Sequence, residues 1–156
     1  MQTHVFYNTA VPKYLRRTGL YARALEKGLK KCARQNIEVN VIFVNEREIL
    51  RINKKYLGHH YVTDVISFNN NQPPIFLPGE PWGFGDIFVC YPVARKNAQK
   101  FNHTFLQEML MYVIHGALHL SGMDDHNPAD RAEMDRQAER IIQNILPSSH
   151  KKSTHS

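Results

Sequence analysis

Hydrophobic and polar positions alternate in some segments of the chain and recur every three to four residues in others. Short apolar runs predict strands over residues 5–7, 38–44, 65–68 and 86–90. Longer helical patterns predict helices over residues 12–35, 45–56, 92–100 and 105–120, and a final amphipathic helix from residue 127 that turns Ile141, Ile142 and Ile145 inward. The resulting order, βαβαββααα, predicts an α+β fold in which helices cover a mixed sheet.

Local signals mark where several of these elements begin and end. Asn45 with Glu48, and Thr104 with Gln107, have the spacing of a capping box at a helix start. Asn127 and Pro128 provide a start for the last helix. Residues 69–81 are rich in asparagine and proline and predict a loop, with the apolar residues 75–77 packing back or forming a small hairpin.

The helix expected over residues 105–120 is apolar nearly all round, so it should be buried, yet it carries His115 and His119. Their spacing of four places both imidazoles on one face, where they can converge on a metal ion. Gly122 can end the helix, so that the chain returns with a third ligand, Asp125 or His126. Three protein ligands would leave the fourth position of tetrahedral zinc open to water, as in catalytic sites. The alternative is a pair of core histidines with hydrogen-bond partners.

The same stretch differs from the metalloprotease signature His-Glu-x-x-His-x-x-Gly-x-x-His at one important position. Gly116 stands where that signature has glutamate. The glutamate is the general base of peptide hydrolysis, so its absence argues against an ordinary protease.

Several motifs together resemble one known family. The stretch His115-Gly-Ala-Leu-His-Leu-Ser-Gly-Met-Asp-Asp-His resembles the YbeY signature His-Gly-x-Leu-His-Leu-x-Gly-Tyr-Asp-His. Three further segments resemble the family in the same order, so that the resemblance covers most of residues 45–134: Ile52-Asn-Lys-Lys-Tyr56, Thr63-Asp-Val-Ile-Ser-Phe68 and Gly85-Asp-Ile-Phe-Val89.

The resemblance implies a fold and an activity. The fold would be a mixed four-stranded sheet covered by about five helices, with a central buried metal-bearing helix in a zincin-like arrangement. The activity would be that of a single-strand-specific, metal-dependent endoribonuclease in ribosomal RNA maturation and ribosome quality control. One zinc ion per chain is the expected cofactor. Single-stranded RNA, ribosomal RNA and ribosomal proteins are the expected partners, whereas DNA is not.

Three positions depart from the family pattern. Leu57 stands where the family usually has an arginine that would suit a phosphate, and Val62 replaces a proline. In the family register, with Met134 as a downstream anchor, Asp125 takes the place of the last histidine. Imidazole is nevertheless the commoner third zinc ligand, so ligand chemistry favours His126 over Asp125.

Composition narrows the class of protein. The chain of 156 residues predicts one domain over residues 1–147, followed by a disordered polar tail over residues 148–156. A net charge of +6 and a pI near 9.4 suit a polyanion such as RNA. The sequence shows neither an apolar membrane span nor a signal peptide, so a cytoplasmic location is expected, in which Cys32 and Cys90 would be free thiols.

Other residues are candidates for the site. Asp124 could accept a hydrogen bond from a ligand imidazole, and Thr63 and Asp64 could either fix a turn or line the cleft. Glu108 is too far along the helix from His115 to be a ligand, and His59 and His60 lie in a polar loop. Basic residues on two helical segments could contact phosphates or could simply form a solvated face: Lys54, Lys55, Arg95, Lys96 and Lys100.

The sequence identifies no general base. The expected catalytic group is a zinc-bound water with His115 as a metal ligand, and attack by metal hydroxide or by the RNA 2′-hydroxyl are both open. Two rivals to the endoribonuclease remain. One is a non-catalytic RNA-binding ribosome-assembly factor, suggested by Leu57, and the other is a zinc hydrolase with another substrate, such as a peptide.

Overall fold

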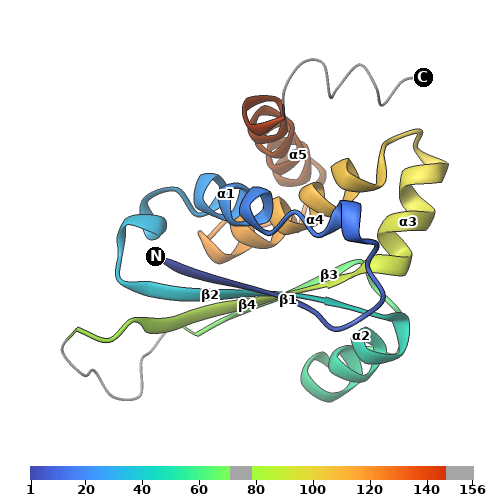
Figure 1. The fold of residues 1–156 in the computed structure, drawn as a ribbon, viewed down its shortest axis with the longest axis horizontal. Coiled ribbons are helices and arrows are strands. Elements are labelled where there is room, and N and C mark those ends of the chain that lie inside the picture. The colour runs from blue at the N-terminus through green and yellow to red at the C-terminus, as the bar shows by residue number, and fades with distance from the viewer. Residues whose placement is uncertain (71–78, 147–156) are drawn as a thin grey trace.

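A mixed four-stranded sheet runs through the middle of the molecule (Figure 1). The computed structural model describes residues 1–70 and 79–146. The order of the strands is β1-β2-β4-β3, in which β1, β2 and β4 are parallel and β3 is antiparallel to β4. Their bounds are β1 Gln2–Tyr7, β2 Ile37–Val44, β3 Val65–Asn69 and β4 Trp82–Cys90. The predicted α+β class and mixed sheet are confirmed.

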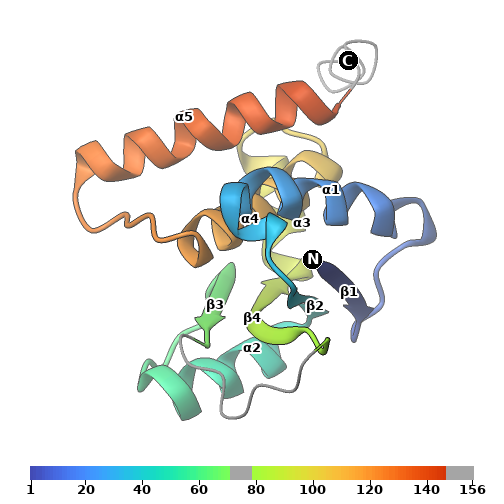
Figure 2. The ribbon, with the colours of Figure 1, turned by 90° about the vertical axis from the view of Figure 1, so that its left-hand side faces the viewer.

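Helices cover both faces of the sheet. Helices α1, α3 and α4 lie on one face with α5 outside them, and α2 lies on the other (Figures 1 and 2). Each face of the sheet has its own apolar cluster. The large cluster lies under α1 and α4, and the small cluster lies under α2. The bounds are α1 Thr18–Leu29, α2 Glu46–Ile52, α3 Tyr91–Lys100, α4 Phe105–Leu120 and α5 Pro128–Ile145.

The single helix predicted over residues 12–35 is wrong, because the structure divides it into three pieces. A short 3₁₀ turn, Lys13–Leu15, precedes α1, and a second 3₁₀ segment, Lys30–Arg34, follows it. Arg16 and Arg17 separate the first two pieces with ψ angles of 60° and 64°, outside the helical range. The leucine, alanine and lysine content supports helix throughout, so composition alone does not reveal these breaks.

Strand β4 begins earlier than the predicted residue 86. Its first residues, Trp82-Gly-Phe-Gly85, have a composition typical of loops, but they pair with residues 37–39 of β2 through a local irregularity in register. Backbone pairing with a neighbouring strand overrides local propensity at this position. Of the predicted loop, residues 71–78 lie outside the described residues, as do its apolar residues 75–77 and the polar tail from residue 148.

Helix α2 starts and ends largely as its sequence predicts. The Asn45 side chain accepts a hydrogen bond from the Glu48 backbone, but the Glu48 carboxylate pairs with Arg51 instead of completing the capping box. A π-helical turn, Asn53–Leu57, continues α2 and ends at Gly58 in the left-handed conformation. This turn brings Leu57 toward the functional pocket described below.

Helix α4 is the central helix of the large apolar cluster. The capping box of Thr104 and Gln107 forms in both directions, as predicted. Most of its side chains are buried, including Glu108, whose carboxylate contacts His103. No helix among residues 1–70 and 79–146 is both long enough and apolar enough to cross a membrane.

Gly116 allows α4 to lie close to the sheet. A Cβ atom at this position would lie 2.6 Å from Cγ2 of Ile87 on β4 and 3.0 Å from the Ser67 hydroxyl on β3. The Ser67 hydroxyl donates a hydrogen bond of 3.4 Å to the Gly116 carbonyl. Only a residue without a side chain lets the two surfaces meet here, and the neighbouring His115 is thereby held beside β3.

We predict that Gly116→Ala destabilises the protein by about 1–3 kcal/mol, as overpacking of a close-packed core does. Ile87 is fully buried and branched close to its backbone, so it cannot readily move away. The measurement is the urea dependence of unfolding followed by circular dichroism. Gly19→Ala is the matched control, because nothing lies within 4 Å of its Cβ position, and it should be neutral or slightly stabilising. Equal stabilities for the two variants would contradict the packing argument.

Candidate active site

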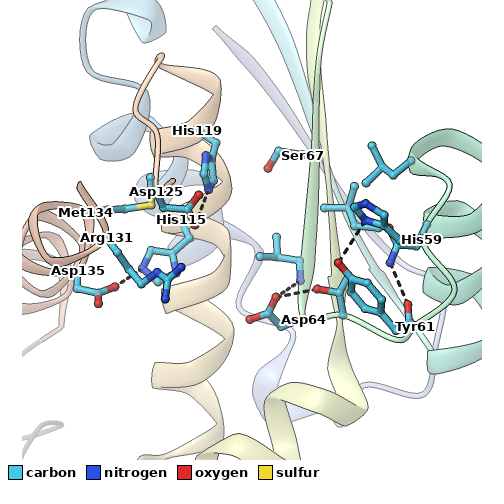
Figure 3. A pocket seen from close by; sticks show the side chains of 15 residues that line it. His59, Tyr61, Asp64, Ser67, His115, His119, Asp125, Arg131, Met134 and Asp135 are labelled. Carbon is cyan, nitrogen blue, oxygen red and sulfur yellow. Dashed lines mark hydrogen bonds and ion pairs between the residues drawn. The ribbon is translucent and has the colours of Figure 1, made fainter. Parts of the chain in front are cut away.

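A pocket of about 530 Å³ opens between α4, the start of α5 and strand β3 (Figure 3). Helices α4 and α5 form one wall, and β3 with the segment before it forms the other. The predicted metal-bearing helix and the Thr63-Asp64 segment therefore line the same pocket. Its lining consists of Asn53, Leu57, His59, Tyr61, Thr63, Asp64, Val65, Ile66, Ser67, His115, His119, Asp125, Arg131, Met134 and Asp135.

The His115 side chain is largely buried, with 22% of its surface exposed. Its Nε2 atom lies 3.2 Å from an Asp135 carboxylate oxygen, but it is buried without a hydrogen bond of good geometry. Burial lowers the pKa of His115 below its ordinary value, and the nearby Asp135 carboxylate only partly opposes this shift. A neutral imidazole with an unsatisfied nitrogen is the form that binds a metal ion.

His119 is oriented by the turn that follows α4. Its Nδ1 lies 3.1 Å from the Met123 carbonyl, which can only accept a hydrogen bond, so Nδ1 carries the proton. Nε2 is then free to coordinate, and it lies 3.7 Å from an Asp125 oxygen. Gly122, at a φ of 107°, allows the reversal that brings both Met123 and Asp125 back to the helix. A backbone carbonyl thus plays the orienting part expected of Asp124.

The two candidates for the third ligand lie in different places. Asp125 lines the pocket beside His119 (Figure 3). The His126 side chain is 82% exposed, does not line the pocket, and has Asp124 as its neighbour at 3.6 Å. The geometry therefore favours Asp125, the reverse of the preference that ligand chemistry suggested. Asp124 faces His126, not His115 or His119.

The donor types at this site fit zinc, but the donors are not gathered around one point. Two imidazoles and a carboxylate are a well-attested zinc ligand set, and the buried, unsatisfied Nε2 of His115 lacks a partner that a metal would supply. In the part of the chain that the structure describes, no three His, Cys, Asp or Glu side chains are close enough together to hold an ion as they stand. Asp125 and Asp135 are half exposed, so their side chains have room to reorient.

The opposite wall carries polar groups from β3 and the segment before it. The Asp64 carboxylate accepts hydrogen bonds from the Val65 backbone at 2.7 Å and from the Thr63 hydroxyl at 3.3 Å. Asp64 therefore holds the backbone at the start of β3 and also lines the pocket. Leu57, 46% exposed, adds an apolar side chain to this wall.

An aromatic pair lies farther along the same wall. The rings of His59 and Tyr61 stack with centroids 5.3 Å apart and planes 15° from parallel, and the Tyr61 hydroxyl contacts His59 Nδ1 at 3.2 Å. Asn53, 1% exposed, donates a hydrogen bond of 2.9 Å to the Tyr61 carbonyl and holds this segment in place. Tyr61 remains 55% exposed, so its ring is accessible from solvent.

Helix α5 contributes three residues that sequence reasoning did not assign to the site: Arg131, Met134 and Asp135. Their spacing of three and four puts them on one face of the helix. Met134 is buried and fixes that face against α4. The spacing was visible in the sequence, but nothing in it showed that this face meets His115 rather than solvent.

The five predicted RNA-contacting residues do not line this pocket. Lys54 and Lys55 are exposed on the π-helical turn after α2, and Lys100 is exposed at the end of α3. Arg95 and Lys96 line a separate shallow pocket on α3, and Lys96 lies 3.5 Å from Glu46.

Asp86 accepts a hydrogen bond from Asn40 within the sheet, and burial raises the pKa of the Cys90 thiol to about 11. Asp86 and Cys90 therefore have structural roles.

Comparisons with known proteins identify the family to which the chain belongs. The family model described as Endoribonuclease YbeY matches residues 12–146. The chain is similar to proteins named Endoribonuclease YbeY from Elusimicrobium minutum, at 50% identity over 93% of this chain and 100% of that protein, and from Staphylococcus carnosus, at 40% identity over 69% and 71%. The solution structure of TM1509 from Thermotoga maritima matches with a TM-score of 0.64 and 27% identity over 98% of this chain and 95% of that one. The chain therefore belongs to the YbeY endoribonuclease family.

Proposed function

We propose that this chain is a metal-dependent endoribonuclease that cleaves single-stranded RNA at the pocket between α4, α5 and β3. The observation that carries the proposal is the pair of α4 imidazoles, His115 and His119, lining one pocket with the Asp125 carboxylate. Membership of the YbeY family supports the reaction class.

The proposed ligands are His115, His119 and Asp125, with one zinc ion per chain. A zinc ion bound to them would act as a Lewis acid toward the scissile phosphodiester. The hydrogen bond from His119 Nδ1 to Met123 keeps Nε2 available, and burial keeps His115 neutral. Asp125 adds a negative charge that two neutral imidazoles do not provide, which strengthens the site for a divalent cation.

The side chains around the pocket leave two routes for the nucleophile. Gly116 provides no side-chain base, and the carboxylates of Asp64 and Asp135 are the acidic groups across and beside the two histidines. Either could accept a proton from a water molecule or from the 2′-hydroxyl of the RNA. The two routes produce different ends on the cleaved RNA. Attack by water gives a linear phosphate, whereas attack by the 2′-hydroxyl gives a 2′,3′-cyclic phosphate.

The stacked rings of His59 and Tyr61 support a preference for single strands. Successive unpaired bases can stack on exposed aromatic rings, whereas the bases of a duplex are already stacked and paired. Tyr61 lies in the pocket wall and is held through its backbone by the buried Asn53. The Tyr61 ring therefore lines the same pocket as the two histidines, where an unpaired base could stack on it.

We also propose ribosomal RNA as the physiological substrate, with a role in its maturation and in ribosome quality control, a cytoplasmic location, and ribosomal proteins as further partners. The family resemblance and the net charge of +6 support this finer assignment. A second candidate function is RNA binding without cleavage during ribosome assembly. The apolar Leu57 in the pocket wall favours it, since leucine cannot bind a phosphate.

The first prediction of this proposal concerns cleavage. Zinc-loaded protein should cut an unstructured RNA strand but not the same sequence in a duplex, and His115→Ala should abolish the activity because it removes a proposed ligand. His126→Ala is the matched control, since it removes an exposed histidine outside the pocket, and it should cut normally. Gel analysis of end-labelled RNA gives both the rate and the type of end. Equal cutting by wild type and His115→Ala would indicate a contaminating nuclease, and binding without cutting would support the assembly factor.

The second prediction ranks the two candidates for the third ligand. Asp125→Ala should weaken zinc binding by more than the roughly 10- to 100-fold that loss of a hydrogen-bond partner of a ligand costs. His126→Ala should leave zinc binding close to that of wild type, because its side chain faces solvent. Competition with a zinc-binding dye measures the affinities without using activity. The reverse ranking would establish His126 as the ligand, and wild-type protein that takes up no zinc would refute the site.

The third prediction concerns the aromatic pair. Base stacking on an aromatic side chain contributes about 1–3 kcal/mol per base, so Tyr61→Ala should weaken single-strand binding by roughly 5- to 150-fold. Tyr61→Phe keeps the ring and should bind nearly as well as wild type. Tyr14→Ala serves as control, because Tyr14 is also exposed but lies in a different pocket. If Tyr61→Ala and Tyr14→Ala bind alike, the ring does not contact a base.

A further inference from the structure

We infer that Arg131 of α5 binds a phosphate group of the RNA strand within the pocket, and that this contact positions the strand over the two α4 histidines. The inference rests on the proposed function and assigns it a further substrate-binding residue. It concerns a side chain on α5, outside the segments where the sequence suggested RNA contacts.

Arg131 is held in the pocket wall by the packing of its helix. It lies in the first turn of α5, where its backbone amide donates a hydrogen bond of 3.0 Å to the Asn127 carbonyl. One turn later Met134 is buried at 2% exposure and Asp135 contacts His115. These contacts fix the helix face that bears Arg131, so the guanidinium is directed to the same side as His115 (Figure 3).

The guanidinium has no carboxylate partner in the described parts of the chain. Arg51 and Arg136 each pair with a glutamate three residues before them. Asp135 is four residues after Arg131, close enough on a helix to pair with it, but its carboxylate lies at His115 instead. No ion pair of Arg131 occurs among residues 1–70 and 79–146, so its hydrogen-bond donors are available to a ligand.

The charges of the pocket lining show why a polyanionic substrate needs this residue. Among residues 1–70 and 79–146, Arg131 is the only lysine or arginine in the lining, which also carries the carboxylates of Asp64, Asp125 and Asp135. These four side chains together carry a formal charge of −2. A single divalent ion would bring the charge of these side chains to zero and would leave no net positive charge to attract a phosphate. A phosphate therefore gains attraction from the guanidinium, whose planar donors match two phosphate oxygens at once.

The test is RNA binding by zinc-loaded protein, with Arg131→Ala compared against Arg136→Ala. Both variants remove one exposed positive charge from α5, but Arg136 is paired with Glu133 and does not line the pocket. Fluorescence anisotropy with a 2′-O-methyl single-stranded oligonucleotide, checked on a gel for intactness, gives the affinity at several salt concentrations. Arg131→Ala should bind about 10- to 100-fold more weakly, as loss of a hydrogen bond to a charged group does.

Two further readouts separate a direct phosphate contact from a general charge effect. The slope of log affinity against log salt should fall by about 0.7 in Arg131→Ala, the value for one phosphate contact on a single strand. Arg131→Lys keeps the charge but loses the two-pronged geometry, so it should bind with intermediate affinity. Thermal unfolding of each variant should match wild type, because Arg131 is exposed.

A compensating substitution tests the location. Leu57 lines the same pocket and is 46% exposed, so Leu57→Arg would supply a guanidinium to it from the other wall. In the Arg131→Ala background it should restore much of the lost affinity. Equal affinities and salt slopes for Arg131→Ala and Arg136→Ala would overturn the inference while leaving the proposed function intact. Failure of the wild-type protein to bind the strand would overturn both.

Discussion

The close contact of α4 with the sheet at Gly116 is the constraint on which the rest of the molecule depends. Because the residue has no side chain, the helix can approach Ile87 and Ser67 closely enough to bury nearly all of its apolar surface. His115 is the next residue, so this approach also sets its distance from the β3 wall. A glutamate at position 116, as in metalloproteases, could not fit without moving the helix away from the sheet. Packing thus accounts for the glycine at the position where a metalloprotease carries its general base.

Burial and local hydrogen bonds prepare the two histidines for different tasks. His115 has a buried, unsatisfied nitrogen and is kept neutral by desolvation, so its environment favours coordination. His119 is more exposed, and its orientation comes from the Met123 carbonyl instead. The half-exposed Asp125 and Asp135 lie beside them and can change conformation without disturbing the core. The imidazoles on α4 are therefore held in place, whereas the Asp125 and Asp135 carboxylates have room to reorient.

The sequence predicted what depends on short-range patterns. The order of the elements, the capping box of Thr104 and the placement of His115 and His119 on one helix face were predicted, because each follows from spacing along a few residues. The sequence missed what tertiary contact decides. The glycine-rich start of β4 becomes a strand only because β2 offers it partners, and Arg131 enters the site only because Met134 anchors that face of α5. The choice between Asp125 and His126 likewise depends on how the turn at Gly122 directs each side chain.

The placement of the proposed metal ligands along the chain has a consequence for how the site tolerates change. His115, His119 and Asp125 belong to one helix and the turn that follows it, so their mutual arrangement is local. The wall that faces them, from Leu57 to Ser67, is joined to α4 only through contacts between distant parts of the sequence. Apart from the contact between Ser67 and Gly116, the two halves can therefore vary separately during evolution. Substitutions on the β3 side would alter which RNA strands fit the pocket, while the proposed ligands on the helical half stay unchanged.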